Sequence, residues 1–199
     1  MILAIVSDRR ADLSARAEAR VGQTLRGKWR VDRLIDVGGM GAVYAGTHRN
    51  GRRAALKVLH PQFSLDPEVR RRFLREGYVA NKIDHPGALA ILDDDVAEDG
   101  SPFLVMELLQ GESLSGWLRR AGGKLAAVEA VAVAGQVLEV LDLAHGHGIL
   151  HRDIKPGNIF IIDEWPRQAP RLRPRSRARR GHFAHSHGGG HGHGNARSG

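Results

Sequence analysis

The residues best equipped for chemistry lie together late in the chain, where residues 151–158 read His-Arg-Asp-Ile-Lys-Pro-Gly-Asn. The octet combines a carboxylate, Asp153, with a cation, Lys155, and an amide, Asn158. An Asp in such a loop can orient and deprotonate a hydroxyl group, and an Asn five residues further on can hold a magnesium ion. The octet is therefore the first candidate for a reaction centre.

A second candidate is the glycine-rich turn formed by Gly38, Gly39 and Gly41. Missing side chains let backbone amides approach phosphate oxygens, although a glycine hairpin taken alone is more often an ordinary turn. Further along, alternation places Ala55 and Lys57 on one face of a strand. A lone lysine there would be a solvated edge charge, but its position after the glycine turn favours a functional lysine beside a small residue.

Five segments, in this order, resemble the motifs of bacterial eukaryotic-type serine/threonine protein kinases. They are Gly-Gly-Met-Gly-Ala-Val-Tyr from 38, Ala-Ala-Leu-Lys from 54, Phe-Leu-Arg-Glu-Gly from 73, Phe-Leu-Val-Met-Glu-Leu-Leu from 103 and the octet. The resemblance covers roughly residues 27–162. It implies ATP and Mg²⁺ as cofactors and transfer of the γ-phosphoryl group of ATP to Ser or Thr of an unidentified protein substrate.

The same resemblance implies a role for each site residue. Asp153 is the base, Lys155 stabilises the transferring phosphoryl group and Asn158 ligates magnesium, while His151 and Arg152 are structural. Lys57 binds the α- and β-phosphates and pairs with Glu76, whereas Glu68 at the helix start serves the helix dipole. Met106 is the gatekeeper, and the backbones of Glu107 and Leu109 bind adenine. The other nucleotide-binding residues are Val37, Gly38, Gly39, Gly41, Val43 and Ala55. Asp36 departs from the family, because it replaces the first loop glycine and would crowd the loop or repel a triphosphate.

Periodicity predicts an α+β fold that begins with a small lobe of five antiparallel strands and one helix, residues 27–110. Strand-like alternation covers 29–36, 42–48 and 53–59, with a tight-turn signal at Asn50-Gly51, and short apolar runs at 88–92 and 103–109 predict two more strands separated by an acidic turn, 93–100. Asp66 before Pro67 predicts the start of a helix that ends near Lys82. Residues 1–26 form a polar leader to which no function is assigned.

Residues 111–162 predict part of a helical large lobe that ends in the octet. Helices are expected at 113–120 and 126–145, and the second is apolar nearly all round, which predicts burial on several sides. No Asp-Phe-Gly and no Ala-Pro-Glu follow the octet. The sequence therefore predicts a kinase domain truncated after its catalytic loop and inactive as encoded.

Composition excludes several other classes. The formal net charge of +8 is concentrated in 163–199, with 8 Lys and Arg against 2 Asp and Glu, whereas 1–162 holds 22 against 20. We therefore expect a solvated basic tail and no nucleic-acid partner. The absence of cysteine fits a reducing cytoplasm. No apolar stretch reaches the length of a signal peptide or a membrane span, so no membrane partner is expected.

Residues 163–199 change abruptly to Arg, Pro, Gly and His, which predicts a disordered tail. Residues 167–177 can be back-translated so that a one-base shift reads Val-Lys-Leu-Leu-Asp-Phe-Gly-Leu-Ala-Arg, with its Asp in the register of Arg171. We therefore expect a reading-frame shift within a kinase gene, the alternative being an evolved Arg-rich tail. Two other functions stay open: a nucleotide-binding pseudokinase or interaction module, and a metal-handling protein that uses the histidines between 182 and 193.

Overall fold

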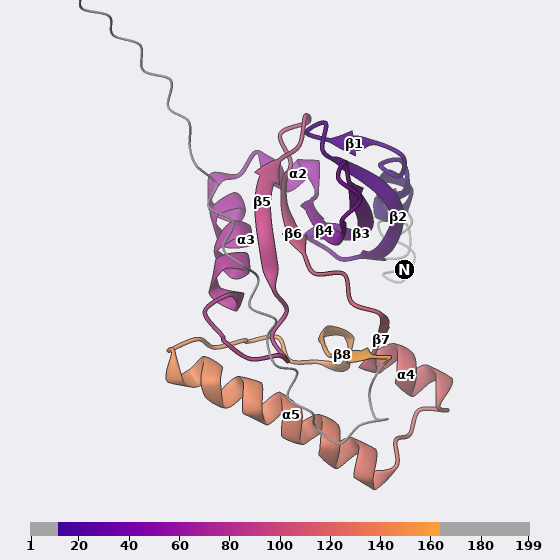
Figure 1. The fold of residues 1–199 in the computed structure, drawn as a ribbon, viewed down its shortest axis with the longest axis vertical. Helices are drawn as coiled ribbons and strands as arrows, with labels where there is room; N and C mark the ends of the chain where they lie inside the picture. Colours follow the sequence, from indigo (N-terminus) through magenta and orange to yellow (C-terminus); the bar gives the residue numbers. More distant parts are fainter. Residues whose placement is uncertain (1–11, 164–199) are drawn as a thin grey trace, which may run out of the picture.

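The computed structural model describes residues 12–163 as an antiparallel sheet above a smaller layer of helices (Figure 1). The predictions for the apolar start, the basic tail, its reading frame and its histidine cluster fall on residues 1–11 and 164–199 and lie outside the described residues. Between 12 and 163, no helix combines the length and the apolar character that a membrane crossing needs.

The sheet has the strand order β1-β2-β3-β4-β6-β5, and every neighbouring pair is antiparallel. Gly51, with φ of 85°, closes the β3–β4 hairpin in the left-handed conformation that the Asn-Gly signal predicts. The sheet confirms the predicted antiparallel lobe and adds a short first strand. Its strands are β1 (Thr24–Leu25), β2 (Trp29–Val37), β3 (Gly41–His48), β4 (Arg53–Leu59), β5 (Ile91–Val96) and β6 (Pro102–Met106).

One face of the sheet is covered by α3 (Pro67–Ala80), which follows the single-turn helix α2 (Pro61–Ser64). The Asp66 carboxylate caps α3 by accepting hydrogen bonds from the backbone N–H groups of Glu68 and Val69 at 2.8 and 3.2 Å. Phe73 and Gly77 are the buried residues of the helix. The predicted helix and its N-cap are confirmed.

Strand β5 lies further along the chain than the strand predicted at residues 88–92. The apolar run 88–92 is mostly a loop, and three of the acidic residues that we expected in a turn, Asp93, Asp94 and Asp95, belong to β5, whereas Glu98 and Asp99 lie in the turn. The β5 backbone pairs with β6, for example Asp94 with Leu104, while the Asp94 carboxylate accepts a hydrogen bond from the Tyr78 hydroxyl at 2.5 Å. Because β5 is an edge strand, its carboxylates reach solvent and partners, so β-propensity alone placed this strand wrongly.

The opposite face of the sheet is covered by the N-terminal residues, which include a helix over 12–18. Ala17 is buried, and its carbonyl accepts a hydrogen bond from the buried Tyr44 hydroxyl at 3.1 Å. The Arg20 side chain pairs with Asp99 in the β5–β6 turn at 2.5 Å. The described part of the leader is therefore packed onto the sheet.

The lower layer contains α4 (Leu114–Arg120), α5 (Ala127–Gly146), the 3₁₀ turn η1 (Pro156–Asn158) and the strand pair β7 (Gly111–Ser113) and β8 (Phe160–Ile162). Both predicted helices are confirmed in position. The prediction that α5 is buried on several sides is wrong: Val128 and Val131 are 75% and 72% exposed, and only Val133 and Ala144 are buried along the helix. Among the described residues, the loop before β5 lies against α5.

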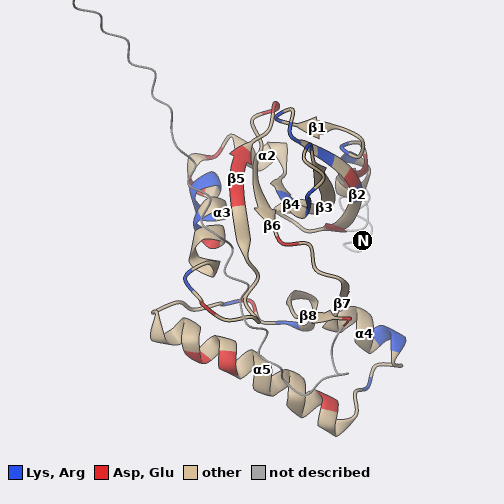
Figure 2. Cartoon of the chain, viewed as in Figure 1, with Lys and Arg blue, Asp and Glu red and all other residues tan. Residues whose placement is uncertain are grey.

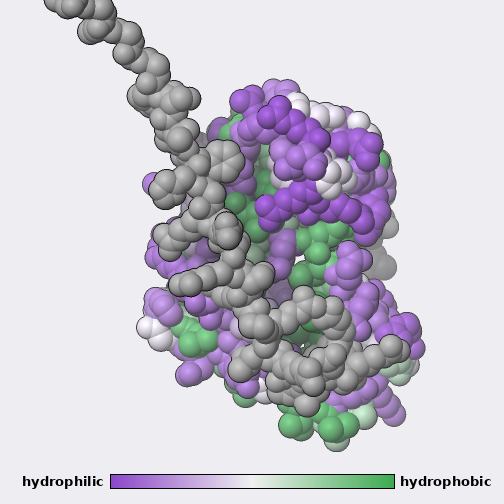
Figure 3. Space-filling view, viewed as in Figure 1, coloured by the Kyte–Doolittle hydropathy of each residue, from purple (hydrophilic) through white to green (hydrophobic). Residues whose placement is uncertain are grey.

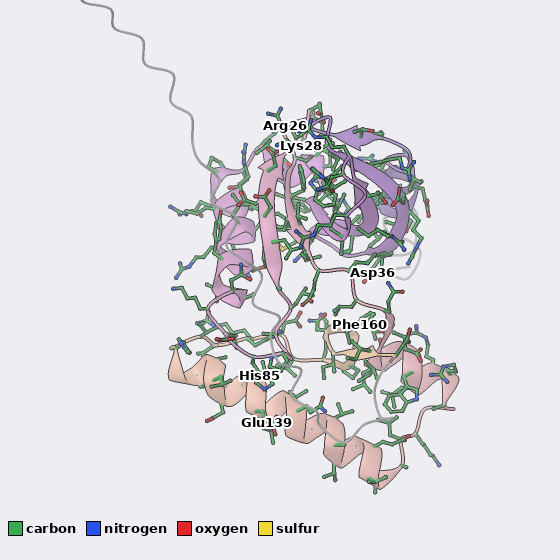
Figure 4. All side chains as sticks on the ribbon, in the orientation of Figure 1. Arg26, Lys28, Asp36, His85, Glu139 and Phe160 are labelled. Carbon is green, nitrogen blue, oxygen red and sulfur yellow. The ribbon has the colours of Figure 1, made fainter. Side chains whose placement is uncertain are left out.

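That loop joins the two layers. The His85 Nε2 lies 3.9 Å from the Glu139 carboxylate of α5, and Figure 4 shows the two side chains together. The Gly87 N–H donates to the other ring nitrogen of His85 at 2.9 Å, and a Cβ on Gly87 would collide with the Val140 side chain. Gly87 thus permits the close approach between sheet and helix.

Candidate active site

The octet forms a hydrogen-bonded loop on the lower layer. The Lys155 Nζ donates to the Asp153 carboxylate at 2.8 Å, and the Asn158 Nδ2 donates to the same carboxylate at 3.0 Å and to the Asp153 carbonyl at 2.8 Å. Arg152, which precedes the carboxylate, has φ of 61°, a conformation that residues other than glycine seldom adopt. The loop therefore converges on Asp153.

These two donors also set the charge of Asp153. The hydrogen bond from Lys155, then the one from Asn158, holds the pKa of the Asp153 carboxyl below its usual range. The carboxylate is therefore ionised at neutral pH and can accept a proton. Because the Asn158 Nδ2 donates its hydrogen bonds to Asp153, the Asn158 Oδ1 is the atom left to ligate a hard cation such as Mg²⁺. The Asn158 amide oxygen and the neighbouring Asp153 carboxylate are both oxygen ligands of the kind that Mg²⁺ prefers.

The β7–β8 pair holds this loop against α4. Gly111 pairs with Ile162, and the Leu114 N–H donates to the Ile159 carbonyl at 2.8 Å. Gly111 has φ of 142°, and a Cβ there would overlap the Ile161 carbonyl. Only glycine therefore lets the two strands approach so closely just after the end of the loop.

The glycine-rich turn joins β2 and β3 and is closed by the Gly38 N–H, which donates to the Gly41 carbonyl at 2.9 Å. Its glycines differ in their surroundings. A Cβ on Gly41 would overlap the Val58 carbonyl of β4, whereas one on Gly39 would meet no atom within 4 Å. Gly41 serves strand packing, and the space beside Gly39 is open to a ligand. Asp36 lies at the lower edge of the sheet, facing the helical layer (Figure 4).

Sequence reasoning missed His60, which touches this turn. His60 is 6% exposed, its N–H donates to the Met40 carbonyl at 2.9 Å, and its Nε2 lies 3.0 Å from the Gly38 carbonyl oxygen. The only available signal was a histidine directly after an apolar strand, which by itself does not indicate function.

Lys57 lies on β4 beside the predicted adenine pocket. Val43 pairs with Lys57 across the β3–β4 ladder, and Ala55 pairs with Met106 across the β4–β6 ladder. Ala55 and Met106 are each 6% exposed and share one apolar cluster with Phe73. The structure thus brings together the predicted floor, lysine and gatekeeper.

Lys57 and Glu76, both described, form no ion pair. The Lys57 Nζ lies 5.5 Å from the centroid of the Phe73 ring, a cation–π contact. Glu76 instead lies 3.3 Å from Arg72 on the outer side of α3. Glu68, the alternative carboxylate, pairs with Arg71 near the helix start. In this conformation Glu76 therefore contacts Arg72, and Lys57 has no carboxylate partner among the described residues.

The segment after β6 is the predicted adenine-binding hinge. The Glu107 N–H donates to the Ala90 carbonyl at 3.1 Å, and the Ala90 N–H donates to the Glu107 carboxylate at 2.8 Å. This pairing occupies the Glu107 N–H and fixes the segment against the loop before β5. Within residues 12–163, the Glu107 carbonyl and the Leu109 N–H have no protein partner, so both are free to bind adenine.

Comparison with known proteins agrees with this geometry. Residues 29–167 match the protein kinase domain family. The serine/threonine-protein kinase PknA of Mycobacterium tuberculosis is 44% identical over 147 residues, which cover 71% of this chain and 34% of PknA. Pkn1 of Myxococcus xanthus is 44% identical over 137 residues, 68% of this chain and 19% of Pkn1. The crystal structure of the Mycobacterium tuberculosis PknI kinase domain superposes with a TM-score of 0.60 at 34% identity, over 71% of this chain and 58% of that domain.

This chain belongs to the protein kinase family, and its relatives place it among the bacterial serine/threonine kinases. Its antiparallel sheet with α3 is the small lobe of that fold. The chain spans about a third of the length of PknA and about a fifth of that of Pkn1.

Proposed function

We propose that this chain binds Mg²⁺ and ATP between the sheet and the octet and carries the catalytic loop of a serine/threonine kinase. The observation that supports this most directly is the cluster in which Lys155 and Asn158 both donate to Asp153. A carboxylate held between these two donors is oriented for an acceptor hydroxyl. The protein substrate is a Ser or Thr side chain in a partner of unassigned identity.

In the phosphoryl transfer that this loop would perform in a complete kinase site, Asp153 takes the proton of the acceptor hydroxyl as its oxygen bonds to the γ-phosphorus. The bond from the γ-phosphorus to the β–γ bridging oxygen breaks, and ADP leaves. Lys57 contacts the α- and β-phosphates, and Lys155 offsets charge on the group in transfer. Mg²⁺, when held by the Asn158 Oδ1, supplies further charge neutralisation. Ala55, Met106, Glu107 and Leu109 surround adenine.

Two features favour nucleotide binding over turnover in the 199-residue chain. Kinases hold magnesium with the Asp of an Asp-Phe-Gly motif as well as with the Asn, and the sequence contains no such tripeptide. In addition, Glu76 is turned away from Lys57. We therefore propose binding without transfer, which is the pseudokinase alternative.

The test measures Mg·ATP binding by calorimetry and phosphate transfer with radiolabelled ATP. We expect binding that Lys57→Met weakens at least about tenfold, because a charged phosphate contact is lost. Asp153→Asn should leave binding nearly unchanged. Absence of binding in the unmodified chain would refute the proposal. Label that appears on a generic substrate and disappears in Asp153→Asn would show that the chain turns over and would overturn the second part.

A further inference from the structure

We propose that His60 is a positioning residue that orients the backbone amides of the glycine-rich turn toward the phosphates of the nucleotide. The inference rests on the proposed ATP binding and adds a residue that lies outside the kinase motifs of this sequence. It depends on three features: the two contacts of His60 with the turn, the rigidity of its own backbone, and the geometry of the peptide planes that it holds.

His60 contacts two carbonyl groups of the turn from one side. Its N–H donates to the Met40 carbonyl at 2.9 Å, and its ring Nε2 lies 3.0 Å from the Gly38 carbonyl. A carbonyl oxygen can only accept, so the Nε2 carries the hydrogen. With 6% of its surface exposed, the imidazole is held under the turn and not in solvent.

The position of His60 is itself fixed. It follows β4 directly, and its carbonyl accepts hydrogen bonds from the Phe63 N–H at 2.9 Å and from the Ser64 hydroxyl at 3.2 Å. Lys57 lies three residues earlier on the same strand. The short segment from Lys57 to His60 therefore links the position of the glycine-rich turn to that of the lysine.

The geometry of the peptide bond links these two contacts to the direction of the neighbouring N–H groups. In a trans peptide the carbonyl of one residue and the N–H of the next point in opposite directions. When His60 holds the Gly38 and Met40 carbonyls, the N–H groups of Gly39 and Gly41 are directed away from it. Among the described contacts, the Gly39 N–H that His60 orients donates to no protein acceptor, the adjacent Met40 N–H donates to none either, and the space beside Gly39 is open. Unpaired amides beside open space form an anion-binding concavity.

The experiment compares His60→Phe, which fills the site without donating from the ring, with His60→Gln, whose amide nitrogen can occupy the position of Nε2. Tyr44→Phe is the matched control, because it removes a buried hydrogen bond to the Ala17 carbonyl on the opposite face of the sheet and touches neither His60 nor the turn. Backbone ¹⁵N relaxation of residues 38–41 and the Kd for Mg·ATP are measured on the full chain, with the Tm of each variant.

We expect His60→Phe to lower the order parameters of residues 38–41 and to raise the Kd about tenfold, as the loss of one buried hydrogen bond would. His60→Gln should restore both, and Tyr44→Phe should lower the Tm without either effect. Unchanged order and affinity in His60→Phe would overturn the proposal. So would a Tyr44→Phe variant that reproduces both changes, since His60 would then act only through folding.

The same data separate this inference from the proposed function. If the unmodified chain fails to bind Mg·ATP, the proposed function falls. The relaxation data then decide whether His60 orders the turn. If the order parameters of residues 38–41 are unchanged in His60→Phe, this inference falls as well. If the unmodified chain binds, and the affinity of His60→Phe is unchanged while Lys57→Met binds weakly, only the His60 inference falls.

Discussion

At the scale of single residues, Asp153 is an exposed carboxylate that two neighbouring side chains orient. Its two donors, Lys155 and Asn158, come from the same octet, so the loop sequence carries its own orienting contacts. General bases gain from a pKa near the working pH, yet these donors lower the pKa of Asp153. The contribution of Asp153 therefore lies in orientation more than in basicity.

We predict that Lys155→Met raises the pKa of Asp153 toward the ordinary Asp value of about 3.9, because the largest cause of the lowering is removed. Carbonyl-detected NMR titration of the Asp153 side chain measures the change. Arg119→Met, which removes an exposed cation of α4, should leave the titration as it is. A Lys155→Met titration that matches the unmodified chain would show that the Lys155 contact is absent in solution.

At the scale of elements, the N-terminal segment is tied to the far end of the sheet by charge. Arg20 pairs with Asp99, and the Arg26 N–H donates to the Glu98 carboxylate at 2.7 Å. Arg26 and Lys28 also lie 3.5 and 3.8 Å from Asp95, and Figures 2 and 4 show this basic turn beside the acidic end of β5. The contacts close the sheet between its first and last strands.

We predict that Arg20→Met lowers the free energy of unfolding at neutral pH by about 1 kcal/mol, a modest value because Asp99 is partly exposed. Burial of the carboxyl raises the pKa of Asp99, but hydrogen bonds from Arg20 and Ser101 outweigh it, so the folded-state pKa is lowered. This stabilisation is complete above the unfolded-state pKa of about 3.9 and is lost as pH falls through the folded-state value. Urea unfolding should therefore show the two proteins converging in acid. A difference that persists there would mean that Arg20 acts by packing alone.

Gly111 gives a second prediction at this scale. Replacing it with Ala should destabilise the β7–β8 pair by about 1–3 kcal/mol, because the backbone conformation is unfavourable and the Cβ would overlap the Ile161 carbonyl. NMR shifts of Phe160–Ile162 should change, together with those of the octet. Gly122→Ala, at φ of 72° with open space around it, separates the cost of conformation from the cost of collision. Equal effects in both variants would contradict the collision.

Local signals predicted the elements whose ends are set by local contacts. The Asp66 cap and the Asn-Gly turn both lie where expected. β5 was misplaced because its pairing with β6 and its ion pair with the basic turn are non-local contacts. No signal in the neighbouring sequence indicates them. The boundary between the lobes at residues 110 and 111 stays a prediction.

At the scale of the whole molecule, the order of the motifs predicted that Ala55, Lys57 and Met106 lie on neighbouring strands, but not how α3 is rotated. That rotation depends on packing: a Cβ on Gly77 would collide with Leu104, and Phe73 lies under the Lys57 ammonium group. Helical periodicity and composition can place Glu76 on α3. The direction of its side chain, however, depends on which residues of α3 pack against the sheet. The contact of His60 with the glycine-rich turn could not be predicted from the sequence, because it too depends on tertiary packing.

The apolar face of α5 carries the last prediction. Val128, Val131 and Leu138 are 75%, 72% and 64% exposed, and Figure 3 shows apolar atoms gathered along the lower side of the molecule. An exposed apolar patch on this scale promotes association. We predict that the 199-residue chain self-associates and binds the dye ANS, and that Val128→Gln, Val131→Gln and Leu138→Gln combined reduce both without lowering the Tm. Val133→Gln is the control, since this residue is 7% exposed and its replacement should lower the Tm by burying an amide. A monodisperse unmodified chain without ANS binding would show that the face is covered in solution.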